Sequence, residues 1–303
     1  MDDLIASFTQ SLPQSGYKIR RLETVDLRHE AGNTESRMVD VLTWPGGRNA
    51  SKTYQPLEEQ PALFYKFADL GSEPSSEEIL VFANQYGWLG NMESVVDPTE
   101  LLTSATGGTT YQNVISGELL EHWYRELNHY IPLLELWEAI SAKDSRYLAS
   151  VVHWHDDLST VSYGNPGVSS MLVASTGTDK ELLQSFAPGE LQRPAMVALV
   201  RAVNKKLGSL CSPALLFEGR SYTDSHLYFV CENLLGVIWL QFAKAVESNI
   251  EYRRCHECSQ PFIPHPGERG KKKKFCTDAC KSRNYRNKRK LSVRGTDAST
   301  PQH

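Results

Sequence analysis

Four cysteines near the C-terminus constrain this 303-residue chain more than any other feature of its sequence. Cys255 and Cys258 form a Cys-x2-Cys pair, 17 residues follow, and Cys276 and Cys280 form a Cys-x3-Cys pair. Each pair can offer two thiolates to one metal ion, and together they complete a tetrahedral shell. Because four thiolates leave no position open for water or substrate, the pattern predicts one structural zinc ion. His256 could replace a ligand only by displacing a better-placed cysteine, and the same holds for His265.

The residues around the cysteines predict a small module. Phe262 and Phe275 can supply its core, and turn-forming prolines and glycines separate the two pairs. Thr277 is a suitable N-cap for a helix over about Asp278–Leu291, which places Cys280 in its first turn. A knuckle followed by a helix start predicts a treble-clef-like arrangement.

Charge is distributed unevenly along the chain. Residues 251–303 carry 14 Lys and Arg against 5 Asp and Glu, whereas residues 1–250 carry 18 against 31. An acidic body with a basic C-terminal module indicates that the module meets a polyanion.

The basic residues are concentrated in the loop before the predicted helix and in the helix itself. Arg283, Arg286 and Lys290 share one helix face, and this composition suits contacts to phosphates and to a groove. The predicted nucleic-acid-binding residues are Lys271, Lys272, Lys273, Lys274, Lys281, Arg283, Arg286, Lys288, Arg289 and Lys290. The alternatives are a helix that docks on protein, including the chain's own acidic body, and a solvated surface that binds nothing.

The C-terminal module resembles the bacterial CGNR-type zinc finger. The resemblance covers about 35 residues and is carried by Cys255-His256-Glu257-Cys258, Phe262, Phe275-Cys276-Thr277-Asp278-Ala279-Cys280, Arg283 and Tyr285-Arg286. After Cys280 the chain has Lys281-Ser282 where the family has Gly-Asn, and it keeps the arginine at Arg283. These fingers follow a mainly helical domain in ABATE-type proteins, which are described as stress-related transcriptional regulators. The resemblance implies DNA binding by the finger.

Residues 1–250 are expected to form a predominantly helical α+β body. The finger is expected over 251–292, with a disordered tail over 293–303. Strands are predicted at 17–25, 37–44 and 147–153, and helices at 57–70, 75–86, 118–142, 180–186, 194–207 and 227–250. Ser75 is a predicted N-cap, with Glu78 as its capping-box partner. Pro132 is expected to kink or split the helix over 118–142. Thr103–Thr110 reads as a linker.

The body shows no convincing catalytic pattern. His153-Trp154-His155-Asp156-Asp157 lacks the next histidine and the later ligands of a dinuclear metal site. His122, Glu126 and His129 lie on one helix face, where paired polar residues are a better interpretation than a metal site. Cys211 and Cys231 are predicted to be inert core residues.

The favoured function is therefore zinc-dependent binding of nucleic acid, with duplex DNA as the expected partner, by a bacterial-type transcriptional regulator. In this hypothesis the body senses a small ligand or a protein partner. The alternative is a protein-interaction module with a zinc staple and no nucleic-acid binding, and a third possibility is an enzyme with its site in the body. The apolar stretch Leu227–Ala245 contains several polar residues, so we expect a buried helix there and no membrane span. The acidic N-terminus has no secretory signal, which predicts a cytoplasmic protein.

Overall fold

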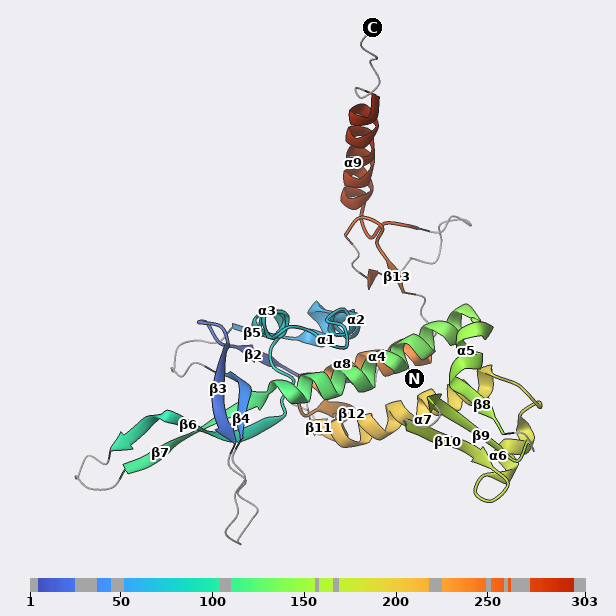
Figure 1. The fold of residues 1–303 in the computed structure, drawn as a ribbon, viewed down its shortest axis with the longest axis horizontal. Helices are drawn as coiled ribbons and strands as arrows, with labels where there is room; N and C mark the ends of the chain where they lie inside the picture. The colour runs from blue at the N-terminus through green and yellow to red at the C-terminus, as the bar shows by residue number, and fades with distance from the viewer. Residues whose placement is uncertain are drawn as a thin grey trace. The chain divides into compact units, whose positions relative to one another are not determined.

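The structure is a computed structural model. It describes residues 5–24, 37–44, 52–103, 110–155, 158–165, 169–217, 225–248, 252–258, 261–262 and 273–296. The chain divides into two compact units, Met1–Ala243 and Lys244–His303. The N-terminal unit mixes helices with several small sheets, as expected of an α+β body, but it contains more strands than the sequence predicts (Figure 1).

Four antiparallel strands form a closed barrel in the order β3-β4-β7-β6. The apolar side chains Leu22, Val39, Val41, Val95 and Leu119 are buried together inside it. Figure 1 shows β6 and β7 extending past the other two strands as a long hairpin. The strands are β3 (Lys18–Thr24), β4 (Met38–Thr43), β6 (Met92–Thr103) and β7 (Thr110–Leu119).

The strands predicted at 17–25 and 37–44 are confirmed as β3 and β4. The Thr103–Thr110 segment joins β6 to β7, and residues 104–109 lie outside the described part of the chain. The predicted linker is therefore the connection of a hairpin, because each strand that flanks it pairs with the other.

The other described strands of the N-terminal unit form three further sheets. In the first, β12 lies between parallel β1 and antiparallel β11; the second has the order β10-β9-β8; the third pairs β2 with β5. Their bounds are β1 (Ile5–Ser7), β2 (Gln10–Leu12), β5 (Lys52–Tyr54), β8 (Val152–Trp154), β9 (Thr160–Asn165), β10 (Ser169–Ser175), β11 (Cys211–Phe217) and β12 (Ser225–Cys231).

A long helix, α4, lies at the centre of the helical core. Its Tyr130 ring packs edge-on against Trp239 of α8, with ring centroids 4.9 Å apart, and against Phe67 of α2 at 5.5 Å. Pro132 lies inside α4, which nevertheless runs without a break. The helices are α1 (Pro56–Glu59), α2 (Leu63–Ala68), α3 (Ser76–Tyr86), α4 (Leu120–Ala142), α5 (Ser145–Val151), α6 (Lys180–Ser185), α7 (Gln192–Leu210) and α8 (Leu234–Ser248).

Local capping signals explain several helix starts. The predicted capping box is confirmed at α3, where the N–H of Glu78 donates to the Ser75 hydroxyl and the Glu78 carboxylate accepts from the Ser75 N–H. At α5, the Asp144 carboxylate accepts the N–H groups of Arg146 and Tyr147. That cap makes most of the strand predicted at 147–153 a helix, so only its end, in β8, is extended.

The predicted helix over 227–250 is wrong in its first part. Residues 225–231 form strand β12, whose full length pairs with β11, and the helix α8 begins only at Leu234. The Asn233 side chain accepts the Gly236 N–H at 2.9 Å and so favours a helix start at this point. A short run of apolar residues is compatible with a strand as well as with a helix, so the spacing alone did not distinguish the two.

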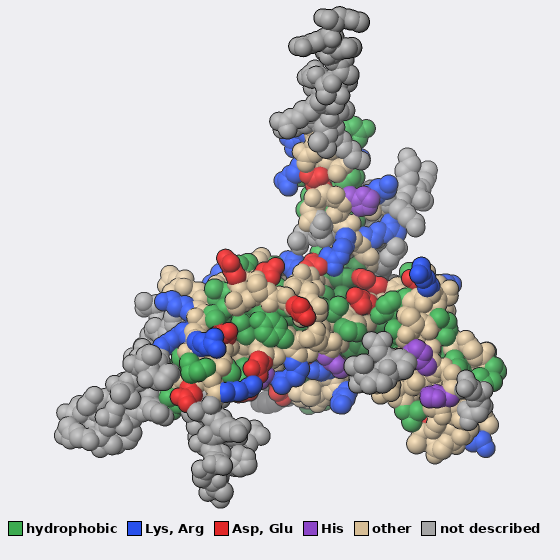
Figure 2. Space-filling model, viewed as in Figure 1, with side chains coloured by type: hydrophobic (Ala, Val, Ile, Leu, Met, Phe, Trp, Pro, Cys, Tyr) green, Lys and Arg blue, Asp and Glu red, His purple; other side chains and the backbone are tan. Residues whose placement is uncertain are grey.

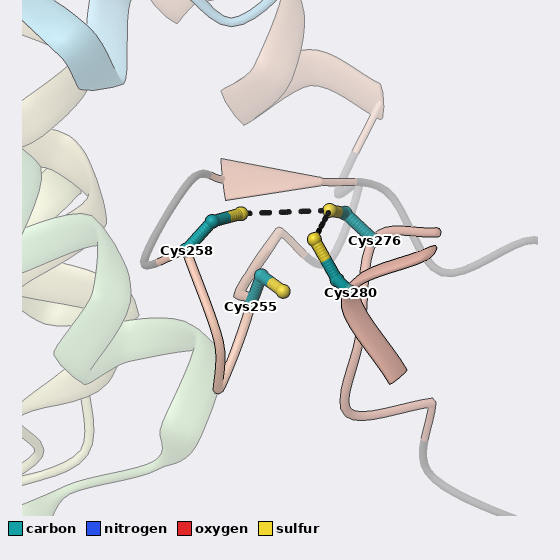
Figure 3. A group of neighbouring side chains, drawn as sticks. All are labelled: Cys255, Cys258, Cys276 and Cys280. Carbon is teal, nitrogen blue, oxygen red and sulfur yellow. Dashed lines mark hydrogen bonds between the residues drawn. The ribbon is translucent and has the colours of Figure 1, made fainter. Parts of the chain in front are cut away.

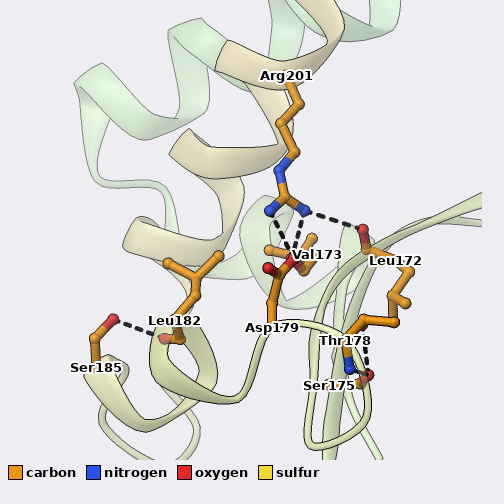
Figure 4. Close-up of polar contacts among 8 residues, drawn as sticks. All are labelled: Leu172, Val173, Ser175, Thr178, Asp179, Leu182, Ser185 and Arg201. Atoms are coloured by element: carbon orange, nitrogen blue, oxygen red, sulfur yellow. Dashed lines mark hydrogen bonds and ion pairs between the residues drawn. The ribbon is translucent and has the colours of Figure 1, made fainter.

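Arg201 of α7 attaches this helix to the sheet that contains β10. Its guanidinium donates to the Val173 carbonyl at 2.6 Å and to the Asp179 carboxylate at 2.9 Å, just before α6 (Figure 4). Nearby, the Ser175 hydroxyl accepts the Thr178 N–H and holds the turn between β10 and α6. In the described part of the chain, no helix combines the length and the apolar character that crossing a bilayer requires.

Candidate metal centre and basic helix

The first cysteine pair lies at a short β-hairpin of the C-terminal unit. Strand β13 (Arg253–Arg254) pairs antiparallel with β14 (Pro261–Phe262). Cys255 follows β13 directly and is buried, and Cys258 comes three residues later at the end of a turn. The hairpin therefore holds both thiols on one tight bend of the backbone.

The start of α9 (Asp278–Thr296) supplies the second pair. The Thr277 hydroxyl accepts the N–H of Cys280 at 3.3 Å, and the Thr277 carbonyl accepts that of Lys281 at 3.1 Å. These bonds confirm Thr277 as the N-cap and place Cys280 in the first turn of the helix. The helix extends to Thr296, beyond the predicted end at Leu291, and residues 297–303 of the predicted tail lie outside the described part.

Two contacts tie the cysteine pairs together. The N–H of His256 donates to the Lys274 carbonyl at 3.0 Å, and the His256 ring meets the Phe275 ring edge-on at 6.0 Å. His256 thus packs beside the cysteines and is not among the grouped metal-ligand candidates. His265 lies outside the described residues.

The four sulfur atoms converge on one point between the turn and the helix start (Figure 3). All lie within 4.8 Å of one another, with Cys258 Sγ 3.6 Å from Cys276 Sγ and Cys276 Sγ 3.5 Å from Cys280 Sγ. A tetrahedron with metal–sulfur bonds of about 2.3 Å has sulfur–sulfur edges of about 3.8 Å. The cluster of Cys255, Cys258, Cys276 and Cys280 could therefore hold a metal ion with little rearrangement.

The site's electrostatics differ between its thiols. Burial by itself raises the pKa of Cys255, but the N–H groups of Cys258, Cys276 and Glu257 face its sulfur and lower the pKa to about 6. Burial and the neighbouring thiols raise the pKa of Cys276 to about 12. Crowded thiols of this kind are relieved by a bound cation, which deprotonates its ligands.

The predicted nucleic-acid-binding residues lie on α9 and in the loop before it. Lys274, Lys281, Arg283 and Arg286 are exposed, and Lys273 is half-buried. Figure 2 shows Lys and Arg side chains projecting from several sides of the described part of this unit. Lys271 and Lys272 lie outside the described residues, and Lys288, Arg289 and Lys290 are described only as backbone within α9.

One acidic residue in this unit was missed by the sequence analysis. The carboxylate of Glu257 accepts a hydrogen bond from Asn284 Nδ2 at 3.0 Å and another from Asn287 Nδ2 at 2.9 Å. The two asparagines lie three residues apart on α9 and therefore share a face. That spacing was visible in the sequence, but nothing there indicated that the partner would be a residue of the Cys255–Cys258 turn.

The polar side chains of α4 pair with side chains elsewhere in the N-terminal unit. They form no metal-ligand group, because the four cysteines are the sole group of three or more potential metal ligands within the described residues. His122 lies 2.9 Å from a Glu93 carboxylate oxygen, and Glu126 accepts from Lys206 Nζ at 2.6 and 2.8 Å. Burial, and next the charge of Lys206, lower the pKa of His129. The interpretation of this face as paired polar residues is confirmed for His122 and Glu126.

In the other histidine motif, the described residues 153–155 belong to no group of three potential metal ligands. His153 Nε2 lies 2.9 Å from the Gly164 carbonyl, and Trp154 donates to the Glu190 carbonyl. Asp156 and Asp157 lie outside the described residues. Cys211 and Cys231 are buried, with their sulfur atoms 3.5 Å apart across β11 and β12.

A buried carboxylate joins the barrel to the helical core, and the sequence analysis missed it too. Glu118, at the end of β7, accepts the N–H groups of Leu89, Gly90 and Asn91 at 2.8–2.9 Å and the indole N–H of Trp123 at 3.0 Å. Burial raises its pKa to about 7, although these N–H groups act in the opposite direction. With four donors arranged around it, Glu118 holds the loop between α3 and β6 in place.

Comparison with family models, with curated proteins and with solved structures found no match to this chain.

Proposed function

We propose that the C-terminal unit is a treble-clef-like module built on one structural zinc ion, and that it binds nucleic acid through α9 and the loop before it. The convergence of four cysteine sulfurs is the observation that supports the metal. Soft thiolate ligands in a closed set of four suit zinc in a structural role. The knuckle at Cys255–Cys258 and the helix start at Cys280 are the parts that such a module requires.

The exposed basic side chains of the unit support nucleic acid as the partner. Lys274, Lys281, Arg283 and Arg286 are exposed within thirteen residues of chain, on a short module whose fold the metal would fix. On the face seen in Figure 2, the N-terminal unit instead carries acidic and basic side chains interspersed. Duplex DNA is the partner we favour, because a basic helix fits the major groove.

The resemblance of the sequence to CGNR-type fingers supports the proposal that this activity belongs to a bacterial transcriptional regulator. Under this proposal the N-terminal unit, which has its own buried core, senses a small ligand or a protein partner. The metal acts by supplying folding free energy to the module, while the chain's own side chains make every contact to the nucleic acid.

The deciding experiment is a binding titration with zinc-loaded full-length protein. Fluorescence anisotropy would be measured with labelled duplex DNA, single-stranded DNA and RNA pools over a series of salt concentrations. If roughly five basic side chains reach phosphates, log K against log salt has a slope of about −4.5 on duplex DNA. Lys274→Ala should weaken all sequences alike and flatten that slope by about one.

Lys180→Ala is the matched control, because Lys180 is an exposed lysine of α6 in the N-terminal unit. It should leave both the affinity and the slope unchanged. If the zinc-loaded protein binds none of the pools at low salt, nucleic-acid binding is rejected, and docking of an acidic protein partner takes its place.

A further inference from the structure

Glu257 occupies an unexpected position for an acidic residue in a basic module. It lies between Cys255 and Cys258, and its two carboxylate oxygens accept separately, one from Asn284 and the other from Asn287. A carboxylate near a phosphate-binding surface repels the ligand, so its presence there calls for a compensating role. Two short hydrogen bonds from one helix face supply that role, since together they resist rotation of α9 about its axis.

These bonds determine which side of α9 faces the knuckle. Cys280 is buried, and Asn284 and Asn287 follow it at intervals of four and three residues, so the three lie on one stripe. At 3.6 residues per turn, Ser282, Tyr285 and Arg286 lie on the opposite side. All three are exposed. Arg283 lies at the edge of the stripe, about 60° around the helix from Cys280, on the side nearer Arg286.

The exposure of Tyr285 is a second observation that distinguishes this face. Its side chain is 77% exposed, the highest value among the exposed large apolar side chains of the described residues. A solvated aromatic ring beside Arg286 on a basic helix is suited to packing against a base or a thymine methyl group. A helix that only attracted phosphates would gain nothing from that ring, because phosphate contacts need charge and hydrogen-bond donors.

We infer that Glu257 is a positioning residue that fixes the rotation of α9, so that Ser282, Tyr285 and Arg286 form the base-contacting face. Tyr285 contacts a base through its ring, Arg286 donates to a base edge, and Arg283 at the side reaches a phosphate. This inference rests on the proposed nucleic-acid binding and adds sequence discrimination to it.

The test uses full-length, zinc-loaded protein and two duplexes, one selected from a random pool for tight binding and one with the same base composition in scrambled order. Glu257→Ala removes both acceptors, and Asn284→Ala combined with Asn287→Ala removes both donors without a change of charge. If the hydrogen bonds of Glu257 to the two asparagines position α9, both variants lose about tenfold or more of the preference for the selected duplex, while zinc content is unchanged. Glu257→Gln, which keeps one acceptor oxygen, should retain more of the preference.

A purely electrostatic role for Glu257 gives a different pattern. Removal of the negative charge would then tighten binding to both duplexes equally in Glu257→Ala and Glu257→Gln, and the asparagine variant would behave as wild type. That pattern overturns the inference. Nuclear magnetic resonance of the side-chain amides gives a readout without nucleic acid. The Asn284 and Asn287 amide signals should shift in Glu257→Ala, and unchanged signals would contradict the two hydrogen bonds to Glu257.

Tyr285 is tested on the same two duplexes. Tyr285→Ala should weaken binding to the selected duplex about tenfold and leave the salt slope unchanged, because no charge is lost. Tyr285→Phe keeps the ring and should stay close to wild type. Arg283→Ala is the contrasting variant, with equal weakening on both duplexes and a slope flatter by about one.

The proposed nucleic-acid binding and the base-contacting face can be rejected separately. Wild-type protein that binds neither duplex rejects the proposed function itself. Wild-type protein that discriminates, alongside a Tyr285→Ala variant that discriminates equally well, retains nucleic-acid binding and rejects only the base-contacting face.

Discussion

The carboxylate of Glu118 accepts the indole N–H of Trp123 at 3.0 Å, across the junction at which β7 ends and α4 begins. The same carboxylate accepts three consecutive backbone N–H groups, from Leu89 to Asn91. One side chain therefore connects the barrel, the long helix and the loop that precedes β6. A substitution at Glu118, or a change in its protonation, should therefore affect the stability of all three parts together.

Glu118→Gln should destabilise the protein at pH 5 by roughly 1–3 kcal/mol. At pH 5 the Glu118 carboxyl is protonated, but both of its oxygens can still accept, whereas the glutamine NH2 group cannot. At least one of the four N–H donors would therefore face another donor in a buried site. Chemical denaturation monitored by circular dichroism would measure the loss. Glu121→Gln is the control, because Glu121 is an exposed residue of α4, and it should have a much smaller effect.

The pH dependence of stability should also identify Glu118. Burial raises its pKa to about 7 in the folded protein, above the value near 4.5 of an exposed glutamate. The folded state therefore binds more protons between these two values, and the stability that Glu118 contributes falls as pH rises from about 4.5 to 7. The gap in unfolding free energy between wild type and Glu118→Gln should narrow over this interval. A gap that stays constant from about pH 5 to 7 would show that the carboxyl is already ionised in the folded protein.

Purified protein should contain one zinc ion per chain, and Cys276→Ser should lose it. A closed structural site supplies on the order of 10 kcal/mol of folding free energy to a small zinc module, so the chain after residue 251 should lose its fold. Elemental analysis measures the zinc, and hydrogen exchange measures the order of the segment. Cys211→Ser changes a buried cysteine outside the cluster and should keep the metal. Freshly purified protein without zinc would contradict the proposal.

Residues 1–250 should fold without the C-terminal module and unfold cooperatively. The reason is that Trp239 and Phe242 of α8 are fully buried, in contact with the Tyr130 ring of α4. A shorter fragment, 1–243, removes the buried Ala245 and the last turn of α8, and should be less stable by roughly 1–2 kcal/mol. Thermal denaturation of both fragments tests this; non-cooperative melting of the longer one would make the module part of the core.

Lys206→Met should destabilise the N-terminal unit by about 3 kcal/mol, because it leaves the buried Glu126 carboxylate without its partner. It should also raise the pKa of His129, since the positive charge of Lys206 is one of the causes that lower it. Nuclear magnetic resonance titration of the histidine ring measures that shift. Adding Glu126→Leu should recover most of the stability, and failure to recover it would point to the lost cation–π contact of the Lys206 ammonium with the Trp239 ring.

Short-range patterns in the sequence predicted much of the local structure. The capping box at Ser75, the helix start at Thr277 and strands β3 and β4 were found in this way, because the groups that interact there are only a few residues apart. Predictions failed where a segment's partner lay far away. The helix predicted from Leu227 begins as strand β12, because β11 and β1 pair with it on either side.

The sequence by itself determined the candidate metal-ligand set. Cysteine spacing within two short segments already restricts which atoms can meet, and the structure brings those four sulfurs together. Only the tertiary structure decided which hydrogen-bond donors surround two carboxylates, those of Glu118 and Glu257. Glu118 accepts from residues 27–29 positions earlier, and Glu257 from asparagines 27 and 30 positions later. A carboxylate can accept from any N–H group that packing brings near it, so its partner is set by the fold and cannot be read from its neighbours in the chain.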